Sequence, residues 1–65
     1  MTELEKLKRL LEHWIEHNEA HMKTYDEWIV KAEALGAKEV SEVLKKVAAE
    51  SGKQGELFRK ALDLI

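Results

Sequence analysis

The sequence contains no cysteine and no proline, and only three glycines among its 65 residues. Without cysteine, disulfides, thiolate zinc sites, iron–sulfur clusters and cysteine nucleophiles are all excluded. Without proline and with so few glycines, long helices can run uninterrupted. A chain this short is one domain and buries little apolar surface alone. Its stability is therefore expected to rest on regular helix packing, self-association or a histidine-based metal site.

Long apolar runs and an excess of charge of one sign are also missing. No apolar stretch approaches the roughly 18 residues that cross a bilayer, and the N-terminus lacks the apolar core of a signal peptide. The 11 basic and 13 acidic residues are interspersed and give a formal net charge of −2. This pattern leaves no basic patch for a nucleic-acid backbone. We expect no membrane or nucleic-acid partner and a cytoplasmic location.

Helix-end signals predict an all-α fold with two helices. Thr2 is followed three residues later by Glu5, which matches the capping box at the start of a helix. Gly36 is the type of residue that lies just past a helix end. The predicted elements are a first helix over about 3–35, a turn at 36–37 and a second helix over about 38–64. Because the turn is short, we expect an antiparallel hairpin.

Apolar residues recur in alternating steps of three and four along both predicted helices, as in the seam of a coiled coil. The predicted first seam is Leu4, Leu7, Leu11, Trp14, Asn18, His21, Tyr25, Trp28, Ala32 and Leu35, flanked by Leu10, Ile15, Met22 and Ile29. The predicted second seam is Val40, Val43, Val47, Ser51, Gln54, Phe58, Ala61 and Ile65. Stripes widened by flanking residues suit a helix with several neighbours. We therefore expect two hairpins to pair into a dimeric four-helix bundle.

Polar residues interrupt both seams at a shared level. Counting outwards from Gly36 pairs Trp14 with Phe58, Asn18 with Gln54, and His21 with Ser51. The sequence thus predicts a polar layer that contains His21, Asn18, Ser51 and Gln54. Two glycines lie near this level in the second helix, where each costs about 1 kcal/mol relative to alanine. Gly52 and Gly55 either break the helix or admit a bulky side chain, such as a tryptophan of the first helix.

His13, His17 and His21 follow one another at intervals of four residues. Each such step turns about 40° around a helix, so His21 is expected in the seam, His17 at its edge and His13 facing outward. Two histidines four residues apart can share a metal ion. His13 and His21 lie about 12 Å apart along the axis, too far to share one easily.

The expected metal ligands are therefore His17 with His21, or His13 with His17 in a more exposed site. A dimer would bring two such pairs together. Imidazole ligands suit Zn, Ni, Cu or Fe, and the sequence does not choose among these metals. Asn18 and Gln54 are candidate partners that fix the tautomers of the imidazoles. The leading functional prediction is a small metal-binding helical-bundle protein.

The same residues allow a second interpretation without a metal. A polar Asn in a coiled-coil seam commonly fixes register and oligomeric state, and a His in a seam can be an ordinary core residue. The alternative is therefore a self-association or protein-interaction module whose His and Asn residues only set helix register. A weaker third idea is a small-molecule or anion site in the polar layer. No Ser–His–Asp or paired-carboxylate arrangement is present, so the chain is not expected to be an enzyme.

The segment His-Trp-Ile-Glu-His-Asn-Glu-Ala-His at residues 13–21 resembles the signature of small, uncharacterised prokaryotic and archaeal helical-hairpin domains. Such domains carry a His-Trp-x-x-His-Asn-x-x-His motif, then an aromatic-containing helix, a Leu-Gly turn and an acidic second helix. The matching residues are His13, Trp14, His17, Asn18, His21, Trp28, Leu35 and Gly36. The resemblance covers nearly the whole chain and implies a helical hairpin. Through its histidine motif it also implies a link to transition-metal handling. The regular, Lys- and Glu-rich heptads would also suit a designed scaffold.

Overall fold

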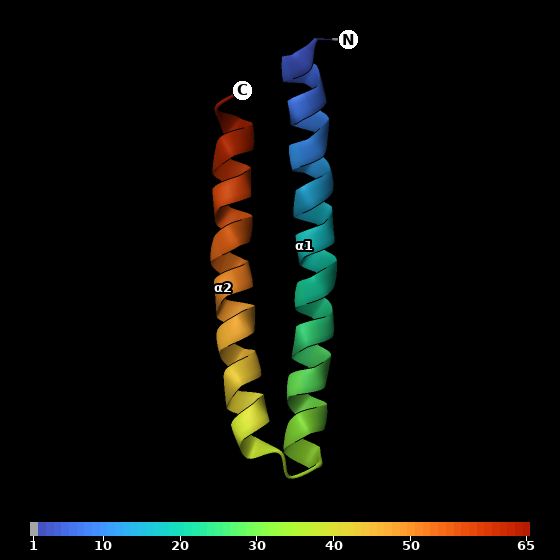
Figure 1. Ribbon diagram of the computed structural model, residues 1–65, viewed down its shortest axis with the longest axis vertical. Coiled ribbons are helices and arrows are strands. Elements are labelled where there is room, and N and C mark those ends of the chain that lie inside the picture. The colour runs from blue at the N-terminus through green and yellow to red at the C-terminus, as the bar shows by residue number, and fades with distance from the viewer. Residues whose placement is uncertain (1) are drawn as a thin grey trace.

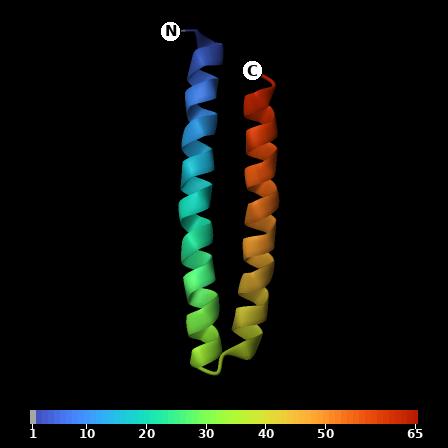
Figure 2. The ribbon, with the colours of Figure 1, turned by 180° about the vertical axis from the view of Figure 1, so that it is seen from behind.

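The computed structural model describes residues 2–65, which form two long helices joined by a short turn (Figure 1). Helix α1 spans Glu3–Ala34 and helix α2 spans Lys38–Asp63. The two helices lie side by side and run in opposite directions, as the view from behind also shows (Figure 2). The predicted all-α antiparallel hairpin is confirmed. The observed helix ends differ from the predicted ones by about one residue at most.

Local hydrogen bonds define both ends of α1. The Thr2 hydroxyl oxygen accepts a bond of 3.1 Å from the backbone N–H three residues further on, which caps the helix start. Gly36 has a φ of +80°, a left-handed conformation that costs glycine little. The Gly36 N–H donates to the Glu33 carbonyl at 3.0 Å, and the Ala37 N–H donates to the Ala32 carbonyl at 2.9 Å. These two bonds form a Schellman motif, which reverses the chain within a few residues.

Each helix presents one row of buried or half-buried residues to the other, spaced by alternating steps of four and three. The α1 row is Leu11, Ile15, Asn18, Met22, Tyr25, Ile29 and Ala32. The α2 row is Ser41, Leu44, Ala48, Ser51, Gly55, Phe58 and Leu62. Among the described residues, only Leu11, Ile15, Ala32 and Ser41 are buried, and of these only Ser41 is completely so. The core of a single hairpin is therefore small.

The observed rows correct the predicted seams. Ile15, Met22 and Ile29 were predicted to flank the first seam but lie within it. Conversely, several predicted seam residues of the first helix are exposed, namely Leu4, Leu7, Trp14, His21, Trp28 and Leu35. In the second seam, Val40, Val43, Val47, Gln54 and Ile65 are exposed as well. The apolar stripe is wider than one neighbouring helix can cover, and the part that packs inward is the part opposite the small residues of α2.

Two glycines let the helices approach closely at mid-length. Helix α2 is continuous through both of them, so no break occurs there. A Cβ atom on Gly55 would lie 2.7 Å from Asn18 Nδ2, and one on Gly52 would lie 3.6 Å from Met22 Cε. The glycines therefore admit Asn18 and Met22, and the expectation of a tryptophan in this space is wrong.

One edge of the helix–helix contact is charged. Acidic residues recur every seven positions on α1 beside its buried row. Basic residues occupy the corresponding row on α2, except that Gly52 stands between Lys45 and Arg59. This charged flank consists of Glu5, Glu12, Glu19, Asp26 and Glu33 with Lys38, Lys45 and Arg59. Two ion pairs cross it, Glu19 with Arg59 and Glu33 with Lys45. Such exposed pairs contribute little to stability because water screens the charges, so they select the side on which the helices face each other more than they stabilise the fold.

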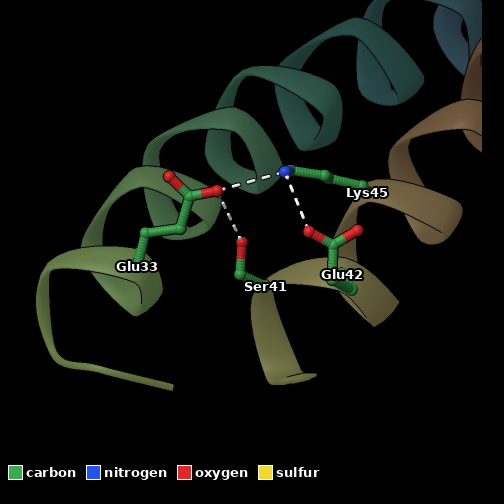
Figure 3. A network of polar contacts seen from close by, with 4 residues as sticks. All are labelled: Glu33, Ser41, Glu42 and Lys45. Carbon is green, nitrogen blue, oxygen red and sulfur yellow. Dashed lines mark hydrogen bonds and ion pairs between the residues drawn. The ribbon is translucent and has the colours of Figure 1, made fainter. Parts of the chain in front are cut away.

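The charged flank ends in a network beside the turn (Figure 3). The Ser41 side chain, which is fully buried, donates a hydrogen bond of 3.1 Å to Glu33 Oε1. Lys45 Nζ lies 3.1 Å from the same Glu33 oxygen and 3.2 Å from Glu42 Oε1. Two hydrogen bonds lower the pKa of Glu33, the one from Lys45 more than the one from Ser41. Two hydrogen bonds raise the pKa of Lys45, the one to Glu33 more than the one to Glu42.

The hairpin is elongated. Its Cα radius of gyration is 15.2 Å and its principal extents are 51, 15 and 12 Å, whereas a compact globule of this length would have a radius of about 11 Å. Within residues 2–65, neither helix has an apolar stretch long enough to cross a membrane. A long molecule with a thin core exposes much of its apolar surface along its edges.

Candidate functional site

The three histidines form a continuous row along the exposed side of α1. The ring centroids of His13 and His17 are 6.1 Å apart, and those of His17 and His21 are 4.4 Å apart with the planes at 83°. His21 also stacks on Tyr25, with 6.0 Å between centroids. All three histidines are exposed, so the expectation that His21 lies in the seam is wrong. Asn18 and Met22 occupy the buried row on either side of it, which leaves the His21 ring at the edge.

Beside His17 and His21 lies an open cavity of about 260 Å³ between the two helices. It is lined by Trp14, His17, Asn18, His21, Tyr25, Ser51, Gln54 and Phe58. The structure thus brings together five of the six predicted site residues, and it leaves His13 outside the cavity. At the end of the cavity nearer the start of α1, the ring centroids of Trp14 and Phe58 lie 5.9 Å apart. The two residues thus face each other, as the count from the turn predicts.

Asn18 links the two helices within this cavity. Its Nδ2 atom donates a hydrogen bond of 2.9 Å to the backbone carbonyl of Ser51. The count from the turn placed Asn18 near Gln54, three residues further along α2. The observed bond is possible because Gly55 has no Cβ atom to obstruct the Asn18 amide. Asn18 is therefore engaged with the backbone of α2.

His17 and His21 are close enough to share one metal ion, as two histidines four residues apart on a helix can do. Among residues 2–65, no three His, Cys, Asp or Glu side chains are grouped so that they could hold a metal ion. A tetrahedral zinc site needs four ligands. One hairpin thus offers two imidazoles, and the remaining ligands would have to come from water or another chain. His13 with His17 is the wider alternative pair.

His21 lies at the centre of a flank of exposed, mostly apolar side chains, on the edge opposite the charged flank, and His17 lies beside this flank. This apolar flank consists of Leu7, Trp14, His21, Trp28 and Leu35 from the first helix and its cap, with Val40, Val43, Val47 and Leu57 from α2. Trp14 is 40% exposed and Trp28 is 50% exposed. An open groove of about 550 Å³ continues the flank along α2 and shares Ser51 and Gln54 with the cavity. Exposed apolar patches of this extent mark interaction surfaces.

The apolar flank was missed from the sequence because its residues were assigned to the interior seam. The charges carried the information needed to find it. Acids at intervals of seven residues on α1 and bases at intervals of seven and fourteen on α2 identify the edges that face each other in an antiparallel pair. The edge of each helix opposite its charged row must then lie on the other side of the hairpin, next to the corresponding edge of the other helix. Those edges are the rows that contain Trp14 and Val47.

The fold and the site define an antiparallel helical hairpin with a histidine pair, one member of which lies at the centre of an exposed apolar flank. The chain belongs to the family described as "Domain of unknown function (DUF8180)", whose model matches residues 7–65. It is similar to an "Uncharacterized protein" of Archaeoglobus fulgidus, 34% identical over 62 residues, which cover 95% of this chain and 98% of that protein. No solved structure gives a significant match. Membership of a small uncharacterised domain family is confirmed, whereas the His-Trp motif as its signature stays a prediction.

Proposed function

We propose that the protein binds a transition-metal ion through His17 and His21, as a dimer of hairpins in which each chain supplies one histidine pair. The observation that carries the proposal is the 4.4 Å separation of the two imidazole centroids, with His21 at the centre of the apolar flank. Burial of that flank by a second hairpin would exclude bulk water and bring the partner's histidine pair near the first. The ligand chemistry suits Zn, Ni, Cu or Fe.

The residues around the pair have supporting roles in this proposal. The Tyr25 ring, 6.0 Å from that of His21, restricts the orientation of the imidazole. Gln54 lies across the cavity and offers an amide that can bond the imidazole nitrogen not used by the metal. Asn18 holds the two helices in register through its bond of 2.9 Å to Ser51. No catalytic role is proposed for any of these residues.

Native mass spectrometry of protein purified without an affinity tag tests the proposal, with Zn²⁺, Ni²⁺, Cu²⁺ or Co²⁺ added. We expect metal-loaded dimers. Metal at 100 times its dissociation constant adds about 2.7 kcal/mol to the stability. For a chain of this size that is a rise in Tm of more than about 10 °C. Because metal-bound imidazoles must be neutral, the rise should shrink in acid.

Histidine variants supply the control. His17→Ala and His21→Ala should each abolish the metal-dependent rise in Tm, whereas His13→Ala should keep it. Equal loss in all three variants would point to unspecific binding along the histidine row. Absence of bound metal in the parent protein, with identical Tm values in metal and in EDTA, would contradict the proposal.

A second candidate function is a self-association or protein-interaction module that needs no metal. The observation that favours it is the Asn18 bond to the Ser51 carbonyl beside Gly55, which accounts for much of the polar layer as a register device. Under this alternative, His17→Ala and His21→Ala keep the oligomeric state and the stability of the parent. The same mass spectra would then show dimers without metal.

A further inference from the structure

We infer that a second copy of this chain docks antiparallel on the apolar flank, about a two-fold axis at the level of His21. In this arrangement Trp14 of each hairpin packs against Trp28 of the partner subunit. The inference deepens and rests on the proposed function, because it states how the two histidine pairs meet. The docking itself needs no metal, so the two can fail separately.

The pattern of the apolar flank on the first helix carries the inference. Its five residues, Leu7, Trp14, His21, Trp28 and Leu35, follow one another at intervals of seven and read the same in both directions. A two-fold axis perpendicular to the helices at His21 would place Trp14 against the partner's Trp28 and Leu7 against the partner's Leu35. An isologous contact requires such self-complementarity along the helix. A parallel arrangement would pair each residue with its own copy and needs no such symmetry.

Helix α2 repeats part of this symmetry at the same level. One pair of its exposed apolar residues, Val43 and Leu57, lies seven residues on either side of Glu50, whereas Val40 and Val47 have no apolar counterpart about that position. The contact between the Trp14 and Phe58 rings, tilted by 42° with centroids 5.9 Å apart, fixes the register between the helices. On that register His21 lies opposite residue 51. The centres of the two helices therefore agree within about one residue, or about 1.5 Å along the axis. The Val43 and Leu57 pair is thus compatible with the two-fold axis that the first helix defines.

The length and area of the flank suit this partner. The axis at residue 21 lies close to the middle of α1, which runs Glu3–Ala34, so two antiparallel copies overlap along most of their length. With extents of 51 and 15 Å, one long face has room for the about 800 Å² per partner that stable interfaces bury. The small core of the single hairpin, with only Leu11, Ile15 and Ala32 as buried apolar residues among those described, gives such burial a large effect.

This axis also determines how the metal ions are arranged. Each His17–His21 pair is centred near residue 19, two residues from the axis. The two pairs are therefore offset by about 6 Å along the bundle. That offset is too long for one ion with bonds of about 2 Å to all four imidazoles. The expected stoichiometry is two ions per dimer, one on each pair. A single shared ion would require an axis at residue 19, where Trp14 would face the partner's Thr24.

Double electron–electron resonance on spin-labelled single-cysteine variants tests the axis, since the native chain has no competing cysteine. The labelled sites are Arg9, Glu16, Lys23 and Val30, which share one exposed row of α1 away from the apolar flank. An axis at residue 21 gives separations along the bundle of about 36, 15, 6 and 27 Å in that order. The Arg9 distance must exceed the Val30 distance, and the Glu16 distance must exceed the Lys23 distance.

Each other outcome is decisive. An axis at residue 19 reverses both inequalities, a parallel dimer gives four equal distances, and a monomer gives no dipolar signal; any of these overturns the inference. The measurements are made in EDTA and again with Zn²⁺. The expected order of distances in EDTA, combined with no metal in native mass spectra, would support the docking and refute the metal function. Two Zn²⁺ ions per dimer would support both.

Discussion

At the scale of single residues, the contact between Asn18 and Gly55 holds the middle of the hairpin together. The amide reaches the Ser51 carbonyl at 2.9 Å only because residue 55 lacks a side chain. A partly buried amide that loses its partner costs about 1–3 kcal/mol. That cost exceeds the roughly 1 kcal/mol that glycine forfeits to alanine inside a helix. Glycine at this position is thus a consequence of packing.

Opposite effects are expected when the two glycines of α2 are replaced by alanine. Gly52→Ala should raise the free energy of unfolding by about 0.5–1 kcal/mol, because its Cβ meets Met22 at an ordinary contact distance of 3.6 Å. Gly55→Ala should lower it by about 1 kcal/mol, because its Cβ would displace Asn18. Urea unfolding followed by circular dichroism measures both values.

A double-mutant cycle tests whether the contact between a Cβ atom on residue 55 and the Asn18 side chain causes the loss of stability in Gly55→Ala. In an Asn18→Ala background the obstruction is gone, so Gly55→Ala should become stabilising, by about as much as Gly52→Ala. If Gly55→Ala destabilises the protein equally with and without Asn18, the explanation by side-chain contact is wrong.

At the scale of elements, each helix has two chemically different edges, and the helices match them edge to edge. The charged edges meet through Glu19 with Arg59 and Glu33 with Lys45. The apolar edges, with Trp14 on one helix and Val47 on the other, are left on the opposite side. Rotating α2 to bury its other edge would place the acids of α1 beside Val47 instead of beside Lys45 and Arg59. The ion pairs therefore contribute specificity of orientation, although each is weak.

The Glu33–Lys45 pair gives the stability of the hairpin a dependence on pH. The pKa of Glu33 is lowered in the folded state, mainly by the hydrogen bond from Lys45. Its contribution is therefore present above the unfolded-state pKa, near 4.5, and is lost as the pH falls through the folded value. The pKa of Lys45 is raised, so its contribution is present below the unfolded-state value of about 10.5 and is lost as the pH rises through the folded value.

The pH effect is measured from urea midpoints between about pH 3 and pH 7. The parent should lose more stability in acid than Glu33→Gln, which cannot gain the charge-dependent contribution. Glu16→Gln, on an exposed part of α1, serves as the control and should follow the parent. Identical acid profiles for the parent and Glu33→Gln would show that the pair makes no net contribution.

The sequence was sufficient to predict the elements and their register. Thr2 and Gly36 marked the ends of α1, and the count from the turn correctly paired Trp14 with Phe58. It was not sufficient to predict which part of the apolar stripe faces inward, because hydrophobic spacing gives the width of a stripe and not the neighbour that covers each part. His21 was misplaced for this reason. The small residues of α2, which decide the closest approach, carry no apolar signal of their own.

At the scale of the whole molecule, an elongated hairpin with a thin core exposes most of its large apolar side chains along one side. Trp28 is 50% exposed and Val30 is 66% exposed, yet they lie on different sides of α1. Only Trp28 belongs to the apolar flank. A charge introduced at position 28 would therefore fall in the proposed interface, whereas the same charge at position 30 would fall outside it. The second variant controls for the general effect of a new charge on the helix.

Trp28→Glu should convert the dimer to a helical monomer, whereas Val30→Glu should leave it dimeric. A charge buried without a partner in the interface costs several kcal/mol, enough to shift the association constant by more than about 100-fold. Sedimentation equilibrium measures the mass. The Tm of the parent should also rise with protein concentration, and that of Trp28→Glu should not. Equal masses for both variants at all concentrations would contradict the assignment of the flank.

The start of α1 and the end of α2 lie at the same end of the molecule, away from the Gly36 turn (Figure 1). A reporter protein fused to either terminus would therefore lie at this same end of the hairpin. In an antiparallel pair the second copy would send its own termini the opposite way. With a hairpin 51 Å long, the assembly would act as a rigid spacer with an attachment point at each end. Energy transfer between donor and acceptor fused to the termini would then be weak even when every chain is paired.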